Sequence, residues 1–567
     1  MADVSVLMSD AATRRIAELE DKLAEVTVER DHLRLAYDRL KADVELMRRR
    51  LFDAKAERLD TAQLELEFAH KVAALDAMNR ELGLPPSPPP PSGDGRTREH
   101  GNKSHKPSGR RDLREVDLPE ERIEILDPSR EGVETQIGWE ESSRISWRRG
   151  GYVRVIIARA KYLDLGEGEA SSSIATAPLP EQILPRSIAT PAMLAHVVTD
   201  KFCWGIPFHR QADRAAGTGM SLDRSLMCRW AEHLGGTVGA TIVTAMRDDA
   251  MRTAFCIATD ATGILVQPIP GGDHLRRGCT HAHFLVQIAD RDHVFFEFLA
   301  RETSAAIGEL FRGFTGYVQA DAKSVYDLLY RPPDQRPLPE DDTPPDLAER
   351  VEVGCWSHLR RKFWEAAITT KDPVAREAVL RVKRIFDLER SWRRKPHAEI
   401  RSLRELHLQP HVDAFFAWAR PELAKLDGRR GMLASALGYA TRHQVAFTRF
   451  LEDGRLELTN NRSERELRRV ATGRKAWLFV GSDDHGQAAG NLMTLIASAR
   501  LHALDPEAYL RDIFRVLPHW PSGRYLELAP KYWLATRARL DAAELEAELG
   551  PLTVPNASPT AEQSVSG

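Results

Sequence analysis

"TAFCIATDATGILVQPI", residues 253–269, decides the fold of this chain. The run is rich in apolar residues and ends in turn-forming residues, which is the pattern of a buried strand. Asp260 lies in the middle of it. A carboxylate among apolar neighbours costs free energy unless it has a partner. The stretch therefore raises the question of what Asp260 binds.

The residues that follow alternate between strand and helix patterns. Two more strands, "AHFLVQIAD" (282–290) and "HVFFEFLA" (293–300), are joined by a hairpin signal. After them come a helix (304–314), a strand (316–323), a short helix (324–330), a strand (351–356) and a helix (357–367). This β-β-β-α-β-α-β-α order predicts an α/β fold whose mixed sheet carries helices on its faces.

Three acidic residues stand out against this pattern. Asp260 lies on the first strand, Asp321 closes the fourth strand, and Glu464 lies in the basic helical segment "LTNNRSERELRRVATGRKAW" (458–477). Carboxylates are the ligands that Mg²⁺ prefers, and two such ions can clamp a phosphodiester during in-line displacement. The pattern therefore favours a metal site made of Asp260, Asp321 and Glu464.

A simpler interpretation of the same acids also exists. The chain has 83 acidic residues, so a set of two aspartates and a glutamate can always be chosen. Glu464 also precedes Arg468 by four residues, the order of a helical ion pair worth about 0.3–0.5 kcal/mol on a solvated face. Spacing alone does not separate the two interpretations.

Composition narrows the class of protein. The chain has 567 residues and a formal net charge of −3, so overall charge does not indicate nucleic acid. Its five cysteines are odd in number and show no C-x-x-C spacing, which fits a reducing cytosol. We find neither a signal-peptide pattern nor a run of 18 or more apolar residues, so we expect a cytoplasmic protein without membrane contact.

The N-terminal part carries a heptad repeat. Its apolar columns run through residues 14–51, and the helical pattern continues to about residue 80. Sustained heptads predict a coiled coil over 14–80, and hence a homodimer through 14–51. The alternative is a single amphipathic helix packed on the rest of the protein. Residues 81–114 form a Pro-rich and then basic linker, which either binds phosphates or acts as a soluble tether.

The remaining segments complete the domain organisation. Residues 115–185 read as a small β-rich region, and residues 186–250 as helices that include a helix-turn-helix pattern. That pattern is typical of helices that recognise DNA, and also of a helical hairpin that only packs on the rest of the protein. The core is expected over 251–500 with an all-α insertion at about 366–455. A helical region (501–550) and a disordered tail (551–567) follow.

Several of these stretches together resemble the transposases of the insertion sequence 66 family. The matching segments are "ATDATG" around Asp260, "GYVQADAKSVYDLL" around Asp321, "CWSHLRRKF" (355–363), and residues 460–500 around Glu464. The resemblance implies an RNase H-like catalytic core with an Asp-Asp-Glu triad, here Asp260, Asp321 and Glu464. It also implies two Mg²⁺ or Mn²⁺ ions, double-stranded DNA at element ends and target, and accessory proteins of the element.

The implied reaction is two-metal phosphoryl transfer. Water cleaves a phosphodiester at the element end, and the freed 3′-hydroxyl attacks target DNA. Basic residues on the Glu464 segment would neutralise phosphates: Arg465, Arg468, Arg469, Arg474 and Lys475. A second basic group surrounds His358, which is either a structural histidine or a contact to a phosphate or leaving group; its other members are Arg360, Arg361 and Lys362.

The sequence also departs from the family. The family's cysteine-rich zinc finger is replaced by "ERIEILDPSREG" and "ARAKYLDLGEG", which contain no cysteine, so we expect no structural zinc. Ala261, Thr459 and Ala476 also differ from the family's usual residues. Two alternatives to an active transposase therefore remain: a decayed or repurposed coiled-coil protein that binds DNA, and a nuclease of the same fold that cuts without joining.

Overall fold

The computed structural model describes residues 118–557, apart from 133–134, 149, 165–172, 268–277 and 338–343, together with Lys22. The chain divides into two units, residues 1–109 and 110–567, and every described residue except Lys22 belongs to the second. The predicted coiled coil (14–80), its dimer contact (14–51) and the linker (81–114) lie outside the described residues, Lys22 excepted. No helix among the described residues is long and apolar enough to cross a membrane.

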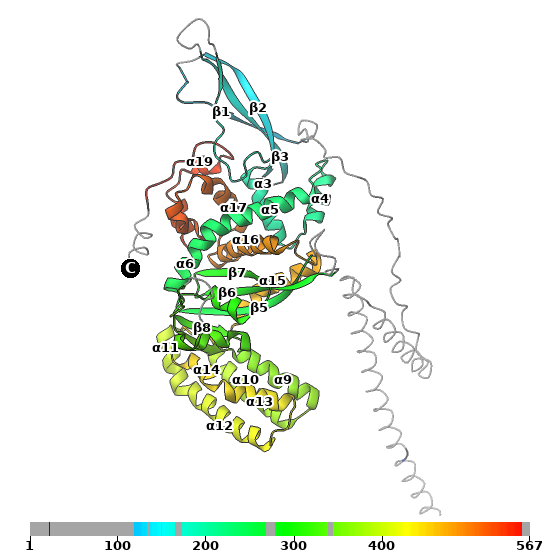
Figure 1. Cartoon of the computed structure of the whole chain (residues 1–567), viewed down its shortest axis with the longest axis vertical. Coiled ribbons are helices and arrows are strands. Elements are labelled where there is room, and N and C mark those ends of the chain that lie inside the picture. Colours follow the sequence, from blue (N-terminus) through cyan, green and yellow to red (C-terminus); the bar gives the residue numbers. More distant parts are fainter. Residues whose placement is uncertain are drawn as a thin grey trace, which may run out of the picture. The chain divides into compact units, whose positions relative to one another are not determined.

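A five-stranded mixed sheet occupies the middle of the second unit (Figure 1). Its strands are β5 (Cys256–Val266), β6 (Thr280–Ala289), β7 (His293–Leu299), β8 (Gly316–Ala320) and β9 (Arg350–Gly354), in the spatial order β7-β6-β5-β8-β9. The first three strands pair antiparallel, while β8 runs parallel to both β5 and β9. The short helices α7 (Ser304–Leu310) and α8 (Asp327–Tyr330) lie between the later strands in sequence. The predicted element order and mixed sheet are confirmed.

Neighbouring residues along a strand of the sheet belong to different hydrophobic cores, so the sheet is apolar on both faces. Leu285 and Phe295 join one hydrophobic core, while Phe284 and Phe296 join another. The second core includes residues of α15 (Asn461–Trp477), and both cores include residues of α16 (Asp483–Leu501). Helices therefore cover both faces of the sheet, as predicted for this α/β fold.

Helix α16 covers the edge of the sheet that is formed by β7. The backbone N–H of Phe296 in the edge strand β7 donates to Thr494 Oγ1 at 2.9 Å, and that of Val294 donates to Ser498 Oγ at 3.0 Å. Figure 1 shows α16 alongside β7. Side-chain oxygens therefore satisfy backbone donors that an unprotected edge would offer to another strand.

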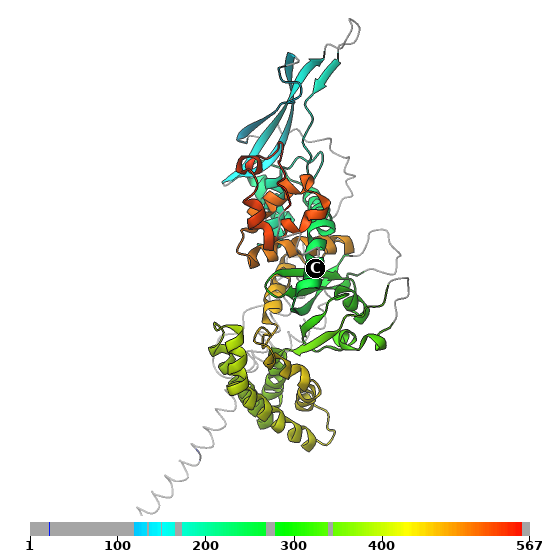
Figure 2. The same ribbon diagram turned by 90° about the vertical axis from the view of Figure 1, so that its left-hand side faces the viewer.

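Between β9 and α15 every regular element is helical. These elements are α9 (Trp356–Thr370), α10 (Pro373–Ser391), α11 (His397–Leu403), the π-helical segment Arg404–Leu408, α12 (Gln409–Lys425), α13 (Met432–Arg442), α14 (Gln444–Thr448) and the 3-10 segment Arg449–Leu451. They share one hydrophobic core and form a bundle (Figure 2). Inside it, the buried Arg404 donates to the carbonyls of Phe450 and Leu456. An all-α segment therefore stands in the long gap before Glu464.

The N-terminal part of the second unit is a four-stranded sheet followed by helices. The strands are β1 (Glu120–Ile125), β2 (Thr135–Arg148), β3 (Gly151–Asp164) and β4 (Ser173–Thr176). The helices are α3 (Pro191–Phe202), α4 (Phe208–Gly217), α5 (Arg224–Val238), the π-helical Gly239–Val243 and α6 (Thr244–Thr253). Asp223 caps α5 by accepting from the Ser225 backbone N–H. α4 and α5 are the helices of the predicted helix-turn-helix pattern.

The C-terminal helices pack on the core that also holds α3 and α16. They are α17 (Pro506–Val516), two 3-10 segments (Leu517–His519 and Ser522–Leu528), α18 (Pro530–Arg537) and α19 (Ala542–Glu546). Residues 551–557, assigned above to the tail, are held by hydrogen bonds from Arg515 to the Pro551 carbonyl and from Arg524 to the Pro555 carbonyl. Residues 558–567 of the predicted tail lie outside the described part.

Candidate active site

Asp260 is placed by the pairing of β5 with β8. Ala258 lies opposite Gln319 in a parallel register, so two residues further on Asp260 lies beside Asp321, which directly follows β8. The Asp260 carboxylate accepts from the Ala261 backbone N–H at 2.8 Å. Burial raises the pKa of Asp260, and the negative charge of Asp321 raises it further, against the opposing effects of the Ala261 N–H and His358.

Glu464 is placed by the start of α15. Asn460, the residue directly before α15, is only 1% exposed. Its side-chain amide donates to the Thr259 carbonyl in β5 at 3.0 Å. The Cys355 thiol in turn donates to the Asn460 side-chain oxygen at 3.0 Å, and burial raises the pKa of that thiol to about 11. Asn460 therefore ties the first turn of α15 to the strand that carries Asp260.

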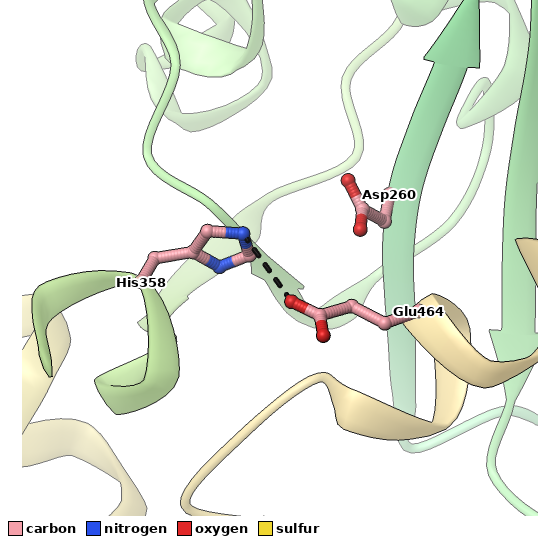
Figure 3. Close-up of side chains that lie close together, drawn as sticks. All are labelled: Asp260, His358 and Glu464. Atoms are coloured by element: carbon pink, nitrogen blue, oxygen red, sulfur yellow. Dashed lines mark ion pairs between the residues drawn. The ribbon is translucent and has the colours of Figure 1, made fainter. Parts of the chain in front are cut away.

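His358 enters the site from the first turn of α9. Its Nε2 lies 3.5 Å from Glu464 Oε1, and Nη2 of Arg361 lies 3.6 Å from the same oxygen. Asp260, His358 and Glu464 each offer a ligand atom, and these atoms lie within 4.8 Å of one another (Figure 3). Three distant segments thus converge, whereas the simpler Glu464–Arg468 pair is not among the ion pairs of the described residues.

Asp321 lies next to this group but outside the 4.8 Å set. One of its oxygens accepts from the Lys323 backbone N–H at 3.3 Å, and the other lies 3.6 Å from Lys323 Nζ. The same ammonium lies 3.6 Å from Glu302 Oε1. A second carboxylate pair, Asp321 and Glu302, therefore adjoins the first group with a lysine between its members.

The donor set of the first group fits a divalent cation. Glu464 Oε1 is buried and makes no hydrogen bond, so it has free acceptor capacity beside His358 Nε2. Carboxylate oxygens suit Mg²⁺ and Mn²⁺, while an imidazole nitrogen suits transition metals better. Two carboxylates and one imidazole can accordingly hold Mn²⁺ directly, or Mg²⁺ through the carboxylates.

The basic residues of α9 divide by their contacts. The Arg361 guanidinium is exposed and faces Glu464, as described above. The charged groups of Arg360 and Lys362 instead lie over aromatic rings, 5.6 Å from the Phe386 centroid and 4.7 Å from the Tyr439 centroid. The Tyr439 hydroxyl also donates to the Asp321 carbonyl at 2.8 Å, which fastens the helical bundle to the end of β8.

The basic residues of α15 divide in the same way. Arg465, Arg468 and Lys475 are exposed, and their spacings of three and seven place them on one face of the helix. Arg469 pairs with Glu466 at 3.1 Å. Arg474 donates to the Gly263 carbonyl in β5, so its guanidinium holds α15 against the sheet.

Comparison with known proteins identifies the family. A family model described as "Transposase IS66 family" matches residues 186–488, and a second, described as "IS66 C-terminal element", matches residues 494–530. The chain belongs to the IS66 family of transposases. Membership places it among DNA-modifying enzymes that bind DNA, and it supports transposition as the function.

Relatives of this chain occur in Sinorhizobium fredii. The uncharacterized protein y4qI is 27% identical over 402 residues, which cover 70% of this chain and 71% of that protein. The uncharacterized protein y4jD is 29% identical over 380 residues, which cover 64% of this chain and 70% of that protein. Both alignments span most of each partner, so the family likeness is not confined to a short motif.

Sequence reasoning missed three residues of this region. Asn460 stood inside the quoted basic segment, but nothing in a sequence separates a buried asparagine from an exposed one. Lys323 and Glu302 were also missed. Lys323 follows Asp321 by two residues, which was a usable signal, whereas Glu302 reaches the site only through the turn after β7.

Proposed function

We propose that this protein is a DNA transposase that cleaves at insertion-element ends and joins the 3′-hydroxyl to target DNA by two-metal phosphoryl transfer. The observation that carries the proposal is the convergence of Asp260 and Glu464, from a central strand and a distant helix, to within 4.8 Å. Family membership independently supports transposition. We also propose that the five-stranded sheet and its helices are the RNase H-like core that the family resemblance implies.

Asp260, Asp321 and Glu464 are the proposed catalytic acids and ligands of Mg²⁺ or Mn²⁺. When bound, such ions supply Lewis acidity that activates water or a 3′-hydroxyl and neutralises charge on phosphorus. Asn460 holds the Glu464 turn against β5, so the carboxylate is positioned before the substrate arrives. We further propose that His358, whose Nε2 lies 3.5 Å from Glu464 Oε1, contacts a phosphate or the leaving group.

The proposed DNA contacts are the predicted basic residues. Arg361 on α9 and the exposed face of α15 that carries Arg465, Arg468 and Lys475 are open to solvent in the structure. Phosphate contacts of this kind set affinity and register rather than sequence preference. Arg360, Lys362, Arg469 and Arg474 are further candidates, and each already makes the contact described above.

The wider organisation is also part of the proposal. We propose a homodimer through the coiled coil of residues 14–51, because two element ends must be held together during transposition. We further propose that residues 186–250 contact DNA, that accessory proteins of the element take part, and that the reaction occurs in the cytoplasm.

Strand transfer by triad variants tests the catalytic assignment. We expect Asp260→Asn, Asp321→Asn and Glu464→Gln each to lower Mg²⁺-dependent joining of a labelled 3′ end at least about a hundredfold, because each removes a carboxylate ligand of the cations whose positive charge stabilises the transition state. DNA binding should persist. Glu466→Gln is the matched control: it lies on the same helix, pairs with Arg469, and should keep activity.

The outcomes separate the alternatives. Full activity in any one of the three variants would remove that residue from the mechanism. Wild-type protein that binds DNA but neither cleaves nor joins it would support the decayed relative. Cleavage without joining would support the nuclease.

A further inference from the structure

Lys323 stands inside the acidic site rather than at its rim. Its Nζ lies 3.6 Å from Asp321 Oδ2 and 3.6 Å from Glu302 Oε1. The two carboxylate side chains are only 12% and 15% exposed, while the lysine side chain is 45% exposed. An ammonium group thus lies between two largely buried carboxylates, on a side chain that is partly open to solvent.

This arrangement uses both oxygens of Asp321. Oδ1 accepts from the Lys323 backbone N–H at 3.3 Å, and Oδ2 faces the Lys323 ammonium. Asp260 and Glu464, by contrast, already lie in the 4.8 Å set that excludes Asp321. A cation bound at Asp321 Oδ2 would lie close to the Lys323 ammonium, and repulsion between the two positive charges favours movement of the lysine away from Asp321.

The environment keeps Lys323 charged. Burial lowers the pKa of Lys323, but the negative charges of Asp321, Glu302 and Asp260 outweigh it and hold that pKa above the ordinary value. Glu302 Oε1 is buried, makes no hydrogen bond and lies 3.6 Å from Lys323 Nζ, while Oε2 of the same carboxylate lies 3.7 Å from His283 Nε2. The lysine therefore offsets the negative charge that these neighbouring carboxylates bring together.

We propose that Lys323 is an internal counter-ion that competes with a divalent cation for Asp321. When DNA binds, the Lys323 ammonium leaves Asp321 and pairs with a backbone phosphate. Its flexible four-carbon stem and exposed position allow that turn toward a backbone phosphate. Cation binding and DNA binding then reinforce each other, because each favours the state in which Lys323 has left Asp321. Lys323 is a positioning residue in this scheme, which rests on the metal site of the proposed function.

Mn²⁺ titration of the full chain, followed by electron paramagnetic resonance, tests this scheme. Without DNA, Lys323→Gln should bind Mn²⁺ about tenfold more tightly than wild type, the scale of one charge acting on a divalent ion at close range in a high-dielectric site. A short duplex of arbitrary sequence should tighten Mn²⁺ binding by wild type, and should do so much less for Lys323→Gln. Lys323→Arg, which keeps the charge, should behave as wild type.

The matched control is Lys425→Gln, which removes the same charge from a Lys–Glu pair at the end of α12 and should leave Mn²⁺ affinity unchanged. Equal or weaker Mn²⁺ binding by Lys323→Gln overturns the counter-ion role, and Lys323→Met provides a second variant should the glutamine chain not fold. Asp260→Asn separates the two proposals: wild-type Mn²⁺ affinity in that variant overturns the metal site itself. If neither wild type nor Lys323→Gln binds Mn²⁺, both proposals fall.

Discussion

Asn460 links two acids of the candidate site, Asp260 and Glu464. It has no charge and no chemistry of its own in the reaction, yet it joins Thr259, the neighbour of Asp260, to the turn that presents Glu464. Its side-chain oxygen is satisfied by Cys355 at the start of α9. One buried amide thus connects the three elements that converge on the site.

Asn460→Ala should therefore disturb both stability and activity. It leaves the buried Thr259 carbonyl and Cys355 thiol without their partner, which costs about 1–3 kcal/mol for an unsatisfied buried group. We expect a lower thermal midpoint, and a higher Mn²⁺ concentration needed for half-maximal strand transfer. Asn461→Ala, at the exposed next position, should change neither. Equal behaviour of the two variants would contradict the role of Asn460.

Asp260 is expected to reduce stability at neutral pH. Its folded-state pKa is raised by burial and by Asp321, so between its unfolded and folded pKa values the folded chain holds a proton that the unfolded chain has lost. Stability from this group is present at low pH and falls as pH rises through that window. Asp260→Asn does not titrate, and its amide oxygen can still accept from Ala261.

The corresponding test is thermal unfolding of both proteins between about pH 4 and pH 8. We expect Asp260→Asn to unfold at a higher temperature than wild type at neutral pH, and the difference to shrink toward acid. A variant that is less stable than wild type by the same margin at every pH would show that the carboxylate does not reduce stability.

At the scale of elements, the sequence predicted what depends on local pattern. Apolar runs bounded by turn residues identified β5 to β9, and the element order implied a mixed sheet. The structure adds that the strand before Asp321 pairs with β5. The nearness of His358 to Glu464 was not predictable in this way, because the whole helical bundle separates α9 from α15 in sequence and the two meet through tertiary contacts such as that between Cys355 and Asn460. Lys323 beside Glu302 likewise depends on how two loops approach.

A close approach of α5 to α16 gives a prediction for two adjacent glycines. A Cβ atom on Gly235 would lie 2.3 Å from the Ala488 carbonyl oxygen of α16, whereas one on Gly236 would meet nothing within 4 Å. Gly235→Ala should therefore destabilise the chain, by about 1–3 kcal/mol as for overpacking. Gly236→Ala should stabilise it by about 0.5–1 kcal/mol through helix propensity.

Thermal unfolding of both glycine variants provides the measurement. If Gly235→Ala were as stable as Gly236→Ala, the two helix backbones would not touch as described. The comparison also bears on the predicted helix-turn-helix, because α5 uses one face for α16 and leaves exposed positions such as Arg229 and His233 on the other. A helix packed on one side can still present its other side to DNA.

At the scale of the whole molecule, the candidate site combines side chains from the central sheet, the helical bundle and α15. The helical bundle contributes His358 and fastens the end of β8 through Tyr439, while α15 contributes Glu464. Such a site forms only when the inserted helices and the sheet fold together. The family match, which runs through residues 186–488, includes both.

Anomalous diffraction from a crystal soaked in Mn²⁺ tests the central claim most directly, because it locates the cation without requiring activity. We predict a peak that is coordinated by carboxylate oxygens of both Asp260 and Glu464, with Asp321 completing the site when DNA is bound. A strong peak elsewhere in the protein, with no manganese in contact with Asp260 and Glu464, would contradict the account.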